Sequence, residues 1–312
     1  MLSPLQLQSI FDDGIKAMIS NVAAGQEGLV LSQLCANKHT GKGVVNICAN
    51  AQELASIEES LSFFAPWLDV IILPAWDCLP YDRVSPSTQV IANRIEALNR
   101  IASIDDNDSA VLVLTTANAL LQKLVPSQVL AGQQFSMAPG NRVDMDKLVE
   151  RLVGEGFDRT STVRERGEFA IRGGILDLFV PGEDEPVRLD FFGDTLESIR
   201  SFDAVSQMTT GQLKTFSLQP MSEISVDEEA IKRFRKNYIE TFGAATRDDA
   251  LYQAISEGRR FAGMEHWLSL FYEKLDTLFD YTQGFQFTYA HDVIEAISSR
   301  EEQIRDHYDS RQ

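Results

Sequence analysis

Residues 166–192 read RGEFAIRGGILDLFVPGEDEPVRLDFF, and this stretch decides the fold of the middle of the chain. It contains short apolar runs separated by turn residues, and one more such run follows it. The predicted strands are Phe169–Ile171, Ile175–Phe179, Val187–Phe191 and Leu196–Phe202, with turns at Gly173-Gly174, Pro181-Gly182 and Gly193-Asp194. Strands joined by connections this short pair with their neighbours in sequence. The stretch therefore predicts an antiparallel meander.

The residues before the meander alternate between strand-like and helical patterns. Apolar residues at helical spacing predict helices at Leu5–Asn21, Gln52–Phe64 and Gln89–Ile104. Strand-like or buried runs lie at Gly28–Leu31, Val44–Cys48, Val70–Leu73 and Val111–Thr115. Such alternation is typical of a parallel sheet covered on both faces, so this part is predicted to be a doubly wound α/β domain.

Two breaks divide the chain into three segments. Prolines and glycines interrupt the pattern between Pro126 and Gly140, and near Pro220 the pattern becomes helical again. Helices are predicted at Asp144–Gly154, Asp227–Phe242, Asp248–Glu257, Glu265–Tyr281 and from Asp292 onward. We expect a first domain over 1–130, an inserted α+β domain over 131–219 and a mostly helical return to the first domain over 220–312. The last helix has no stop signal, which indicates a segment of a longer protein.

The composition is that of an acidic globular protein. The 312 residues are 44% hydrophobic, with a formal net charge of −18. This charge repels nucleic acid, so any DNA contact requires a local basic patch. The apolar runs are far shorter than the roughly 20 residues that cross a bilayer, and we expect a cytoplasmic protein. Cys35, Cys48 and Cys78 are widely spaced and are expected to be buried thiols.

No motif for nucleotide binding or catalysis is recognised. A phosphate-binding loop requires G-x-x-x-x-G-K-[ST], whereas Gly25–Gly28 lacks the lysine and Gly41–Gly43 lacks the hydroxyl. The four histidines are scattered and indicate neither a metal site nor histidine-based catalysis. Asp177 and Asp190 lie beside arginines, which favours ion pairs over acid/base catalysis. We therefore expect no catalytic residue, no cofactor and no metal.

Arginines and phenylalanines gather around the meander. The set comprises Arg159, Arg164, Arg166, Arg172, Arg188 and Arg200, interleaved with Phe157, Phe169, Phe191 and Phe192. These residue types dominate interface hot spots, so a partner-binding face is one interpretation. The other is that the arginines neutralise neighbouring carboxylates inside the small domain, and composition does not decide between them. A local DNA-binding module and an α/β nucleotide-using enzyme domain with an unrecognised site are further alternatives.

Two motifs resemble a known family. Residues 73–87, LPAWDCLPYDRVSPS, resemble the P-x-W-[DE]-x-L-P-Y-[DE]-x-x-S-P segment of bacterial transcription-repair coupling factors. Residues 166–179 resemble the G-x-[FY]-x-x-R-G-x-x-[LI]-D-[LIV]-F motif that these factors share with UvrB. Val187–Asp194 and Phe261–Glu265 are also similar, so the resemblance covers nearly the whole chain.

The resemblance implies a fold and a role. The implied fold is the N-terminal, UvrB-like module: a degenerate P-loop-NTPase-like parallel-sheet domain with an inserted small α+β domain. The implied role is that of a non-catalytic adaptor for transcription-coupled nucleotide excision repair, which binds the excision-repair protein UvrA through Arg172, Arg188 and Phe192. Contacts with RNA polymerase, and ATP-driven translocation on DNA, are implied for other domains of the parent protein.

The spacing of the implied contact residues adds a geometric expectation. In an extended strand, Arg188 and Phe192 point to the same side, and Leu189 and Phe191 point to the other. We expect the second pair to pack in the core, and the contact residues to contribute little to it. We also expect the strand of Arg172 to pair with Val187–Phe192 and so to place the two arginines together.

Overall fold

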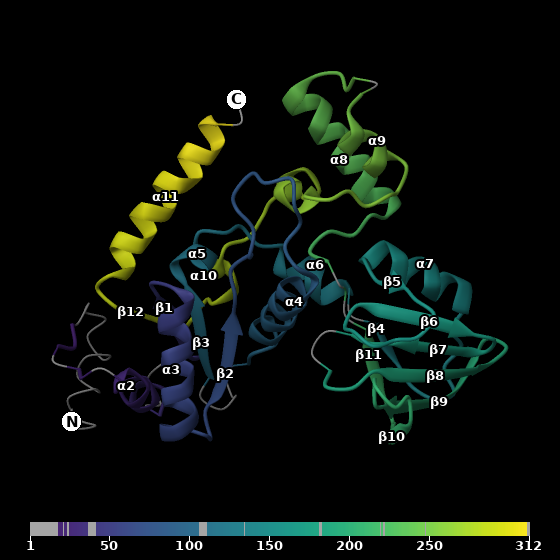
Figure 1. The fold of residues 1–312 in the computed structure, drawn as a ribbon, viewed down its shortest axis with the longest axis horizontal. Helices are drawn as coiled ribbons and strands as arrows, with labels where there is room; N and C mark the ends of the chain where they lie inside the picture. The colour runs from purple at the N-terminus through teal and green to yellow at the C-terminus, as the bar shows by residue number, and fades with distance from the viewer. Residues whose placement is uncertain are drawn as a thin grey trace. The chain divides into compact units, whose positions relative to one another are not determined.

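A computed structural model describes most of the chain (Figure 1). The described residues are 18–20, 22–23, 25–36, 42–105, 111–133, 135–180, 183–218, 220, 222–246 and 248–310. The chain divides into two compact units, which are treated separately: unit 1 comprises Met1–Ala75, Ala97–Leu124 and Asp276–Gln312, and unit 2 comprises Trp76–Glu96 and Val125–Leu275. The helix expected at Leu5–Asn21 lies almost entirely outside the described residues.

Unit 1 contains a four-stranded parallel sheet in the order β12-β1-β3-β2. Its strands are β1 (Val44–Cys48), β2 (Asp69–Leu73), β3 (Val111–Thr116) and β12 (Gln286–Tyr289). The two central strands, β1 and β3, are buried along their whole length, as parallel strands covered on both faces must be. The predicted parallel sheet is confirmed, and β12 is a strand that the sequence pattern did not reveal.

Helices α2 (Glu27–Cys35) and α3 (Ala51–Phe64) share a core with β1 and β3. The strand-like interpretation of residues 28–31 is therefore wrong, because so short an apolar run does not distinguish a buried strand from a buried helix. Gly28 allows α2 to approach α3 closely: a Cβ at this position would lie 2.5 Å from Ser60 Oγ. The other helices of unit 1 are α5 (Ala117–Leu120), α10 (Leu278–Tyr281) and α11 (Val293–Asp309). Helix α4 (Thr88–Ala102) begins in unit 2 and ends in unit 1.

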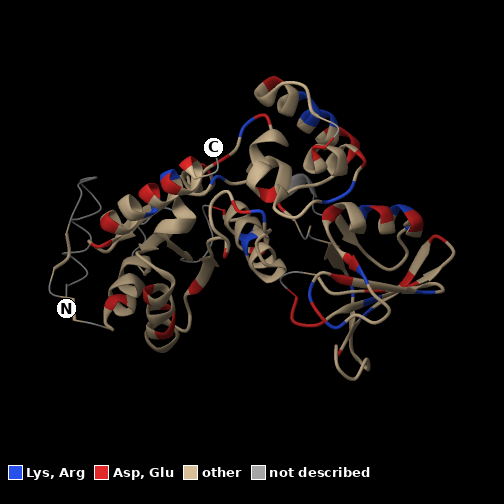
Figure 2. Ribbon diagram, turned by 45° about the horizontal axis from the view of Figure 1, so that its top comes forward, with Lys and Arg blue, Asp and Glu red and all other residues tan. Residues whose placement is uncertain are grey.

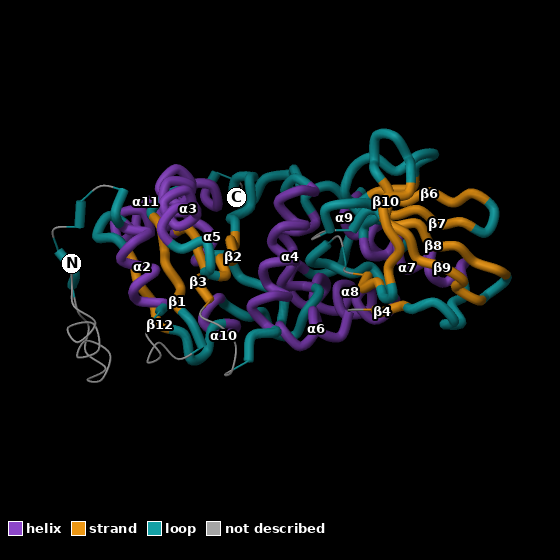
Figure 3. Tube along the Cα trace, turned by 90° about the horizontal axis from the view of Figure 1, so that it is seen from below, coloured by secondary structure: helices purple, strands orange, loops and turns teal. Residues whose placement is uncertain are grey.

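Unit 2 contains a six-stranded sheet in the order β10-β9-β8-β7-β6-β5 (Figure 1). Figure 3 shows β6 to β9 of this sheet side by side in orange. Its strands are β5 (Asp158–Arg159), β6 (Glu168–Arg172), β7 (Ile175–Leu178), β8 (Val187–Phe192), β9 (Thr195–Phe202) and β10 (Thr209–Leu213). From β6 to β10, each strand pairs antiparallel with the next, and the short β5 is parallel to β6. The predicted antiparallel meander is confirmed.

One face of this sheet packs on helix α7 (Met145–Glu155). The helix begins at Asp144, whose carboxylate accepts the N–H groups of Asp146 and Lys147, and it ends at Gly156, which has a φ of 99°. Apolar side chains of α7 and of the four strands β6 to β9 form a continuous core, which includes Leu148, Leu152, Phe169, Leu176, Leu189 and Ile199. Strands β4 (Phe135–Met137) and β11 (Phe216–Leu218) form a separate antiparallel pair. The opposite face of the large sheet carries polar side chains together with a smaller buried apolar cluster of Val163, Ala170, Phe179 and Phe202.

The remaining part of unit 2 is helical. It consists of α6 (Ser127–Gln133), α8 (Glu228–Phe242), α9 (Ala250–Ser256) and the 3-10 helix η1 (Met264–Leu270). The segment expected to be helical over 265–281 is helical only at its two ends, because Asp276 between η1 and α10 forms a β-bridge with Leu124. Asp280 then accepts hydrogen bonds from the Thr277 backbone and hydroxyl, and so starts α10 as a new helix. Over the described part of the chain, no helix is both long enough and apolar enough to cross a membrane.

Candidate protein-binding site

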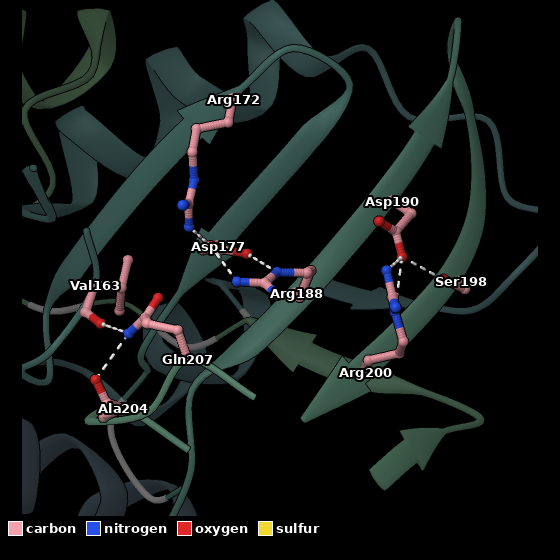
Figure 4. A network of polar contacts seen from close by, with 9 residues as sticks. All are labelled: Val163, Arg172, Asp177, Arg188, Asp190, Ser198, Arg200, Ala204 and Gln207. Atoms are coloured by element: carbon pink, nitrogen blue, oxygen red, sulfur yellow. Dashed lines mark hydrogen bonds and ion pairs between the residues drawn. The ribbon is translucent and has the colours of Figure 1, made fainter. Parts of the chain in front are cut away.

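The face of the antiparallel sheet opposite α7 carries a row of charged side chains (Figure 4). We term this row the arginine face and define it as Arg172, Asp177, Arg188, Asp190 and Arg200. The strand register places Asp177 opposite Arg188, and Arg188 opposite Arg200. Like charges that face each other across strands are destabilising, so both arginines require a carboxylate partner. Three arginines and two aspartates leave this face with a net charge of +1.

Asp177 holds two of the three arginines. Its carboxylate accepts hydrogen bonds from Arg172 Nη2 at 2.5 Å, from Arg188 Nε at 2.7 Å and from Arg188 Nη2 at 2.9 Å. The Asp177 side chain is 0% exposed. A buried carboxylate requires such donors, because removing an unpaired charge from water costs several kcal/mol. One buried group therefore fixes two cationic side chains.

The two arginines differ in how much they face the solvent. The Arg188 side chain is 16% exposed, and its guanidinium lies 4.6 Å from the centre of the Phe202 ring. The hydrogen bond to Asp177 raises the pKa of the Arg188 guanidinium, which stays charged. The Arg172 side chain is 50% exposed. Arg172 therefore presents N–H groups to the solvent, whereas Arg188 belongs largely to the sheet.

A second carboxylate holds the third arginine. Asp190 Oδ2 accepts hydrogen bonds from Arg200 Nη2 at 2.6 Å, from Arg200 Nε at 3.0 Å and from Ser198 Oγ at 2.5 Å. The register of β8 against β9 shifts between Asp190 and Phe191. Beyond the shift, Phe191 stays in the core, and Phe192 at the end of β8 is 77% exposed. A large exposed aromatic side chain thus lies on the strand that carries Arg188 and Asp190.

The structure confirms the predicted sides of β8, because Leu189 and Phe191 are buried in the core. The predicted pairing of the Arg172 strand with β8 is wrong, since β7 lies between β6 and β8. The guanidinium groups still meet, because Asp177 on β7 bonds both. The expectation that the contact residues contribute little to folding is also wrong for Arg188, which is mostly buried. Their role in binding a partner stays a prediction.

Comparisons with known proteins show matches for the antiparallel sheet and for most of the chain. Residues 135–224, which contain the whole antiparallel sheet, match the family described as the UvrB interaction domain. The chain is 35% identical over 266 residues to the transcription-repair-coupling factor of Haemophilus influenzae, which covers 85% of this chain and 22% of that protein. It is 34% identical over 247 residues to the transcription-repair-coupling factor of Escherichia coli, which covers 79% of this chain and 21% of that protein. The chain is a UvrB-like module homologous to part of the transcription-repair coupling factors.

The UvrB-like module has an internally capped helix where an α/β sheet ordinarily binds its ligand, beyond the carboxyl ends of β1 and β3. The loop after β1 leads directly into α3. Asn50 Oδ1 accepts the N–H groups of Gln52 and Glu53, and the Glu53 carboxylate accepts the N–H of Ala49 at 2.6 Å. These backbone groups are the kind that hold phosphate in nucleotide-binding folds. Here the chain's own side chains bond them. The sequence analysis considered Gly25–Gly28 and Gly41–Gly43 as possible phosphate-binding loops. Gly28 lies in α2, and Gly41 lies outside the described residues.

Unit 2 of the UvrB-like module also contains a buried ion pair that the sequence did not reveal. Arg94 Nε donates to Glu223 Oε1 at 2.6 Å, and their side chains are 0% and 1% exposed. Trp76 Nε1 donates to the same oxygen at 3.2 Å. Arg94 and Glu223 lie 129 residues apart, so no local spacing identifies them.

Nearby contacts give the motif at residues 73–87 a structural role. Ser85 Oγ donates to Glu265 Oε2 at 2.6 Å and accepts the N–H of Gly263 at 2.8 Å. Gly263 has a φ of 79°, and a Cβ on it would lie 2.9 Å from the Arg83 carbonyl carbon. Residues 261–265 also resemble the coupling factors, and the motif that contains Ser85 bonds directly to them. The two motifs therefore stabilise the fold of unit 2.

The cysteines and histidines form no site in the described residues. Cys35 and Cys48 are buried, and burial raises the pKa of each thiol to about 12. Cys78 is only half-buried, contrary to expectation, and its Sγ lies 3.8 Å from His266 Nε2. Desolvation raises the Cys78 pKa to about 11, so the thiol is protonated at neutral pH. No group of three or more His, Cys, Asp or Glu side chains among the described residues is placed to hold a metal.

Proposed function

We propose that this chain is a non-catalytic adaptor that binds UvrA through the arginine face and Phe192. The observation that carries the proposal is the grouping of Arg172, Arg188 and Phe192 on β6 and β8, within the segment that matches the UvrB interaction domain. We further propose residues 131–219 as the UvrA-binding domain. The surrounding protein is then a transcription-repair coupling factor that recruits UvrA to stalled RNA polymerase.

The charge distribution favours an acidic partner surface. The chain has a net charge of −18, yet the arginine face carries +1. Figure 2 shows Lys and Arg together with Asp and Glu on the strands of this sheet. Arginine forks bind carboxylates with directional hydrogen bonds, and an exposed phenylalanine fills an apolar pocket. A UvrA surface that combines carboxylates with an apolar notch suits both features.

RNA polymerase and DNA are proposed partners of the whole coupling factor rather than of this module. The chain spans between a fifth and a quarter of the length of the relatives named above. Contacts with RNA polymerase and DNA, and any ATP-driven movement, are accordingly proposed for the whole coupling factor. The proposed task of this module is to provide the contact with UvrA.

Single substitutions on the exposed part of the face test the proposal. Arg172→Ala and Phe192→Ala should each weaken UvrA binding by about 2 kcal/mol, or roughly thirtyfold, because exposed arginine and phenylalanine side chains are typical hot spots. Titration of each variant with UvrA, followed by calorimetry, measures the change. Lys147→Ala, which removes a cation from α7 on the other side of the sheet, is the matched control and should bind normally. Binding by both variants at wild-type affinity would contradict the proposal.

A second test concerns the absence of catalysis. We expect no binding and no hydrolysis of ATP, because Asn50 and Glu53 already bond the backbone N–H groups at the start of α3. Calorimetry with ATP and Mg²⁺ should give no heat beyond dilution, with UvrB as the positive control. Saturable binding at micromolar nucleotide would show that the domain has kept a nucleotide site.

A further inference from the structure

We propose that Asp177 is a positioning residue, which holds Arg172 and Arg188 in the geometry that binds the partner without contacting the partner itself. The proposal rests on the proposed function of the arginine face and deepens it. It assigns a role to a side chain that no partner reaches, since Asp177 is 0% exposed.

The Asp177 carboxylate accepts three hydrogen bonds, one from Arg172 and two from Arg188. Arg188 is held on two sides, by both oxygens of Asp177 and by the ring of Phe202. Arg172 is the last residue of β6, and its long side chain is fixed at its tip by Asp177 Oδ2 at 2.5 Å. Ordering a long side chain before association removes part of the entropic cost of binding. The Asp177 carboxylate therefore orders both arginine side chains before the partner binds.

Asp177→Asn has two opposing effects on UvrA affinity, so the direction of the change shows which effect is larger. Asp177 also neutralises charge, so its replacement by asparagine raises the net charge of the arginine face from +1 to +2. If Asp177 merely competed with the partner's carboxylates, this change would strengthen binding to an acidic surface. If Asp177 positions the arginines, the variant binds more weakly despite its greater positive charge.

The experiment compares Asp177→Asn with Glu155→Gln in the full chain. Glu155 provides the matched control, because it is also a buried carboxylate that holds an arginine, Arg151 at 2.6 Å, but it lies on α7 on the other side of the sheet. Titrations with UvrA are made at a temperature at which circular dichroism shows every variant folded. We expect Asp177→Asn to weaken binding at least about tenfold, and Glu155→Gln to change it by no more than about twofold. Unchanged or tighter binding by Asp177→Asn overturns the proposal.

A double-mutant cycle separates positioning from general damage. In the Arg172→Ala background, Asp177→Asn should cost clearly less affinity than in the wild type, because one of the two arginines that it positions is already gone. Equal costs in both backgrounds overturn the proposal, because a purely structural defect acts in both alike. If Asp177→Asn does not fold, Asp177→Glu keeps the charge and moves the carboxylate by one methylene. Weaker binding by that variant supports positioning, and unchanged binding contradicts it.

The outcomes also separate this proposal from the proposed function. If Arg172→Ala and Phe192→Ala weaken binding but Asp177→Asn does not, UvrA docking stands and only the positioning role falls. If neither Arg172→Ala nor Phe192→Ala affects binding, the docking face itself is wrong. In the free protein, the Arg188 Nε–H resonance gives a reading that needs no UvrA: it should exchange slowly with solvent in the wild type and faster in Asp177→Asn.

Discussion

Replacing Arg94 with methionine is expected to lower the free energy of unfolding by about 3–5 kcal/mol, because it leaves the carboxylate of Glu223 buried without its cation. Both side chains are almost completely inaccessible to solvent. Urea denaturation of the full chain, followed by circular dichroism, measures the loss. The matched control lies on the same helix: Arg100 pairs with Asp69, but these side chains are 42% and 50% exposed. Arg100→Met should cost no more than about 1 kcal/mol.

A compensating variant identifies the cause of that loss. Arg94→Met combined with Glu223→Leu removes both charges and should recover a large part of the stability, because apolar pairs often replace buried ion pairs without loss. Trp76 Nε1 loses its acceptor in this variant, so the recovery should be incomplete. Equal stabilities for Arg94→Met and Arg100→Met would show that burial of the pair does not determine its contribution.

Arg188→Ala is expected to produce two losses at once. It should weaken UvrA binding by about thirtyfold and, unlike Arg172→Ala, also lower the free energy of unfolding by about 3 kcal/mol. The reason is that Arg188 supplies two of the three hydrogen bonds to the buried Asp177 and stacks on Phe202. Arg172→Ala leaves those two bonds in place and should lose binding alone.

Chemical denaturation and UvrA titration of the two variants separate these contributions. Adding Asp177→Asn to Arg188→Ala should restore part of the stability, because no buried charge then remains, but it should not restore binding. If Arg188→Ala is as stable as Arg172→Ala, the buried ion pair contributes less than its geometry indicates.

Local sequence patterns predicted strands β1 to β3 of the parallel sheet and β6 to β9 of the antiparallel sheet. The period-two alternation of β8 predicted which side chains enter the core, and short glycine-containing turns predicted the antiparallel order. The pattern was not sufficient for α2, where four residues fit a strand and a helix equally well. The pattern also missed β12. This strand has only four residues, and its partner β1 lies far away in the sequence, at the other end of the chain.

The candidate site was predictable in part. Its residue types and their sides of the strands followed from spacing and from the resemblance to coupling factors. The ion pairs followed only in part: both aspartates were expected to pair with neighbouring arginines, and Arg172 does bond Asp177. Arg188, however, also pairs with Asp177, and Asp190 pairs with Arg200. Such pairs depend on the register between strands, and a bulge changes that register. Arg94 and Glu223 lie 129 residues apart in the sequence, so only the three-dimensional fold brings them together.

The position of β12 in the parallel sheet constrains the order of folding during synthesis. β1 pairs with β3 on one side and with β12 on the other, so its second edge has no partner until residues 286–289 leave the ribosome. By then all the residues of unit 2 have been translated. A nascent chain that has emerged only to residue 275 therefore holds the antiparallel sheet complete and the parallel sheet one strand short. Unpaired strand edges bind other extended chains, so the edge of β1 is open to such pairing in this interval.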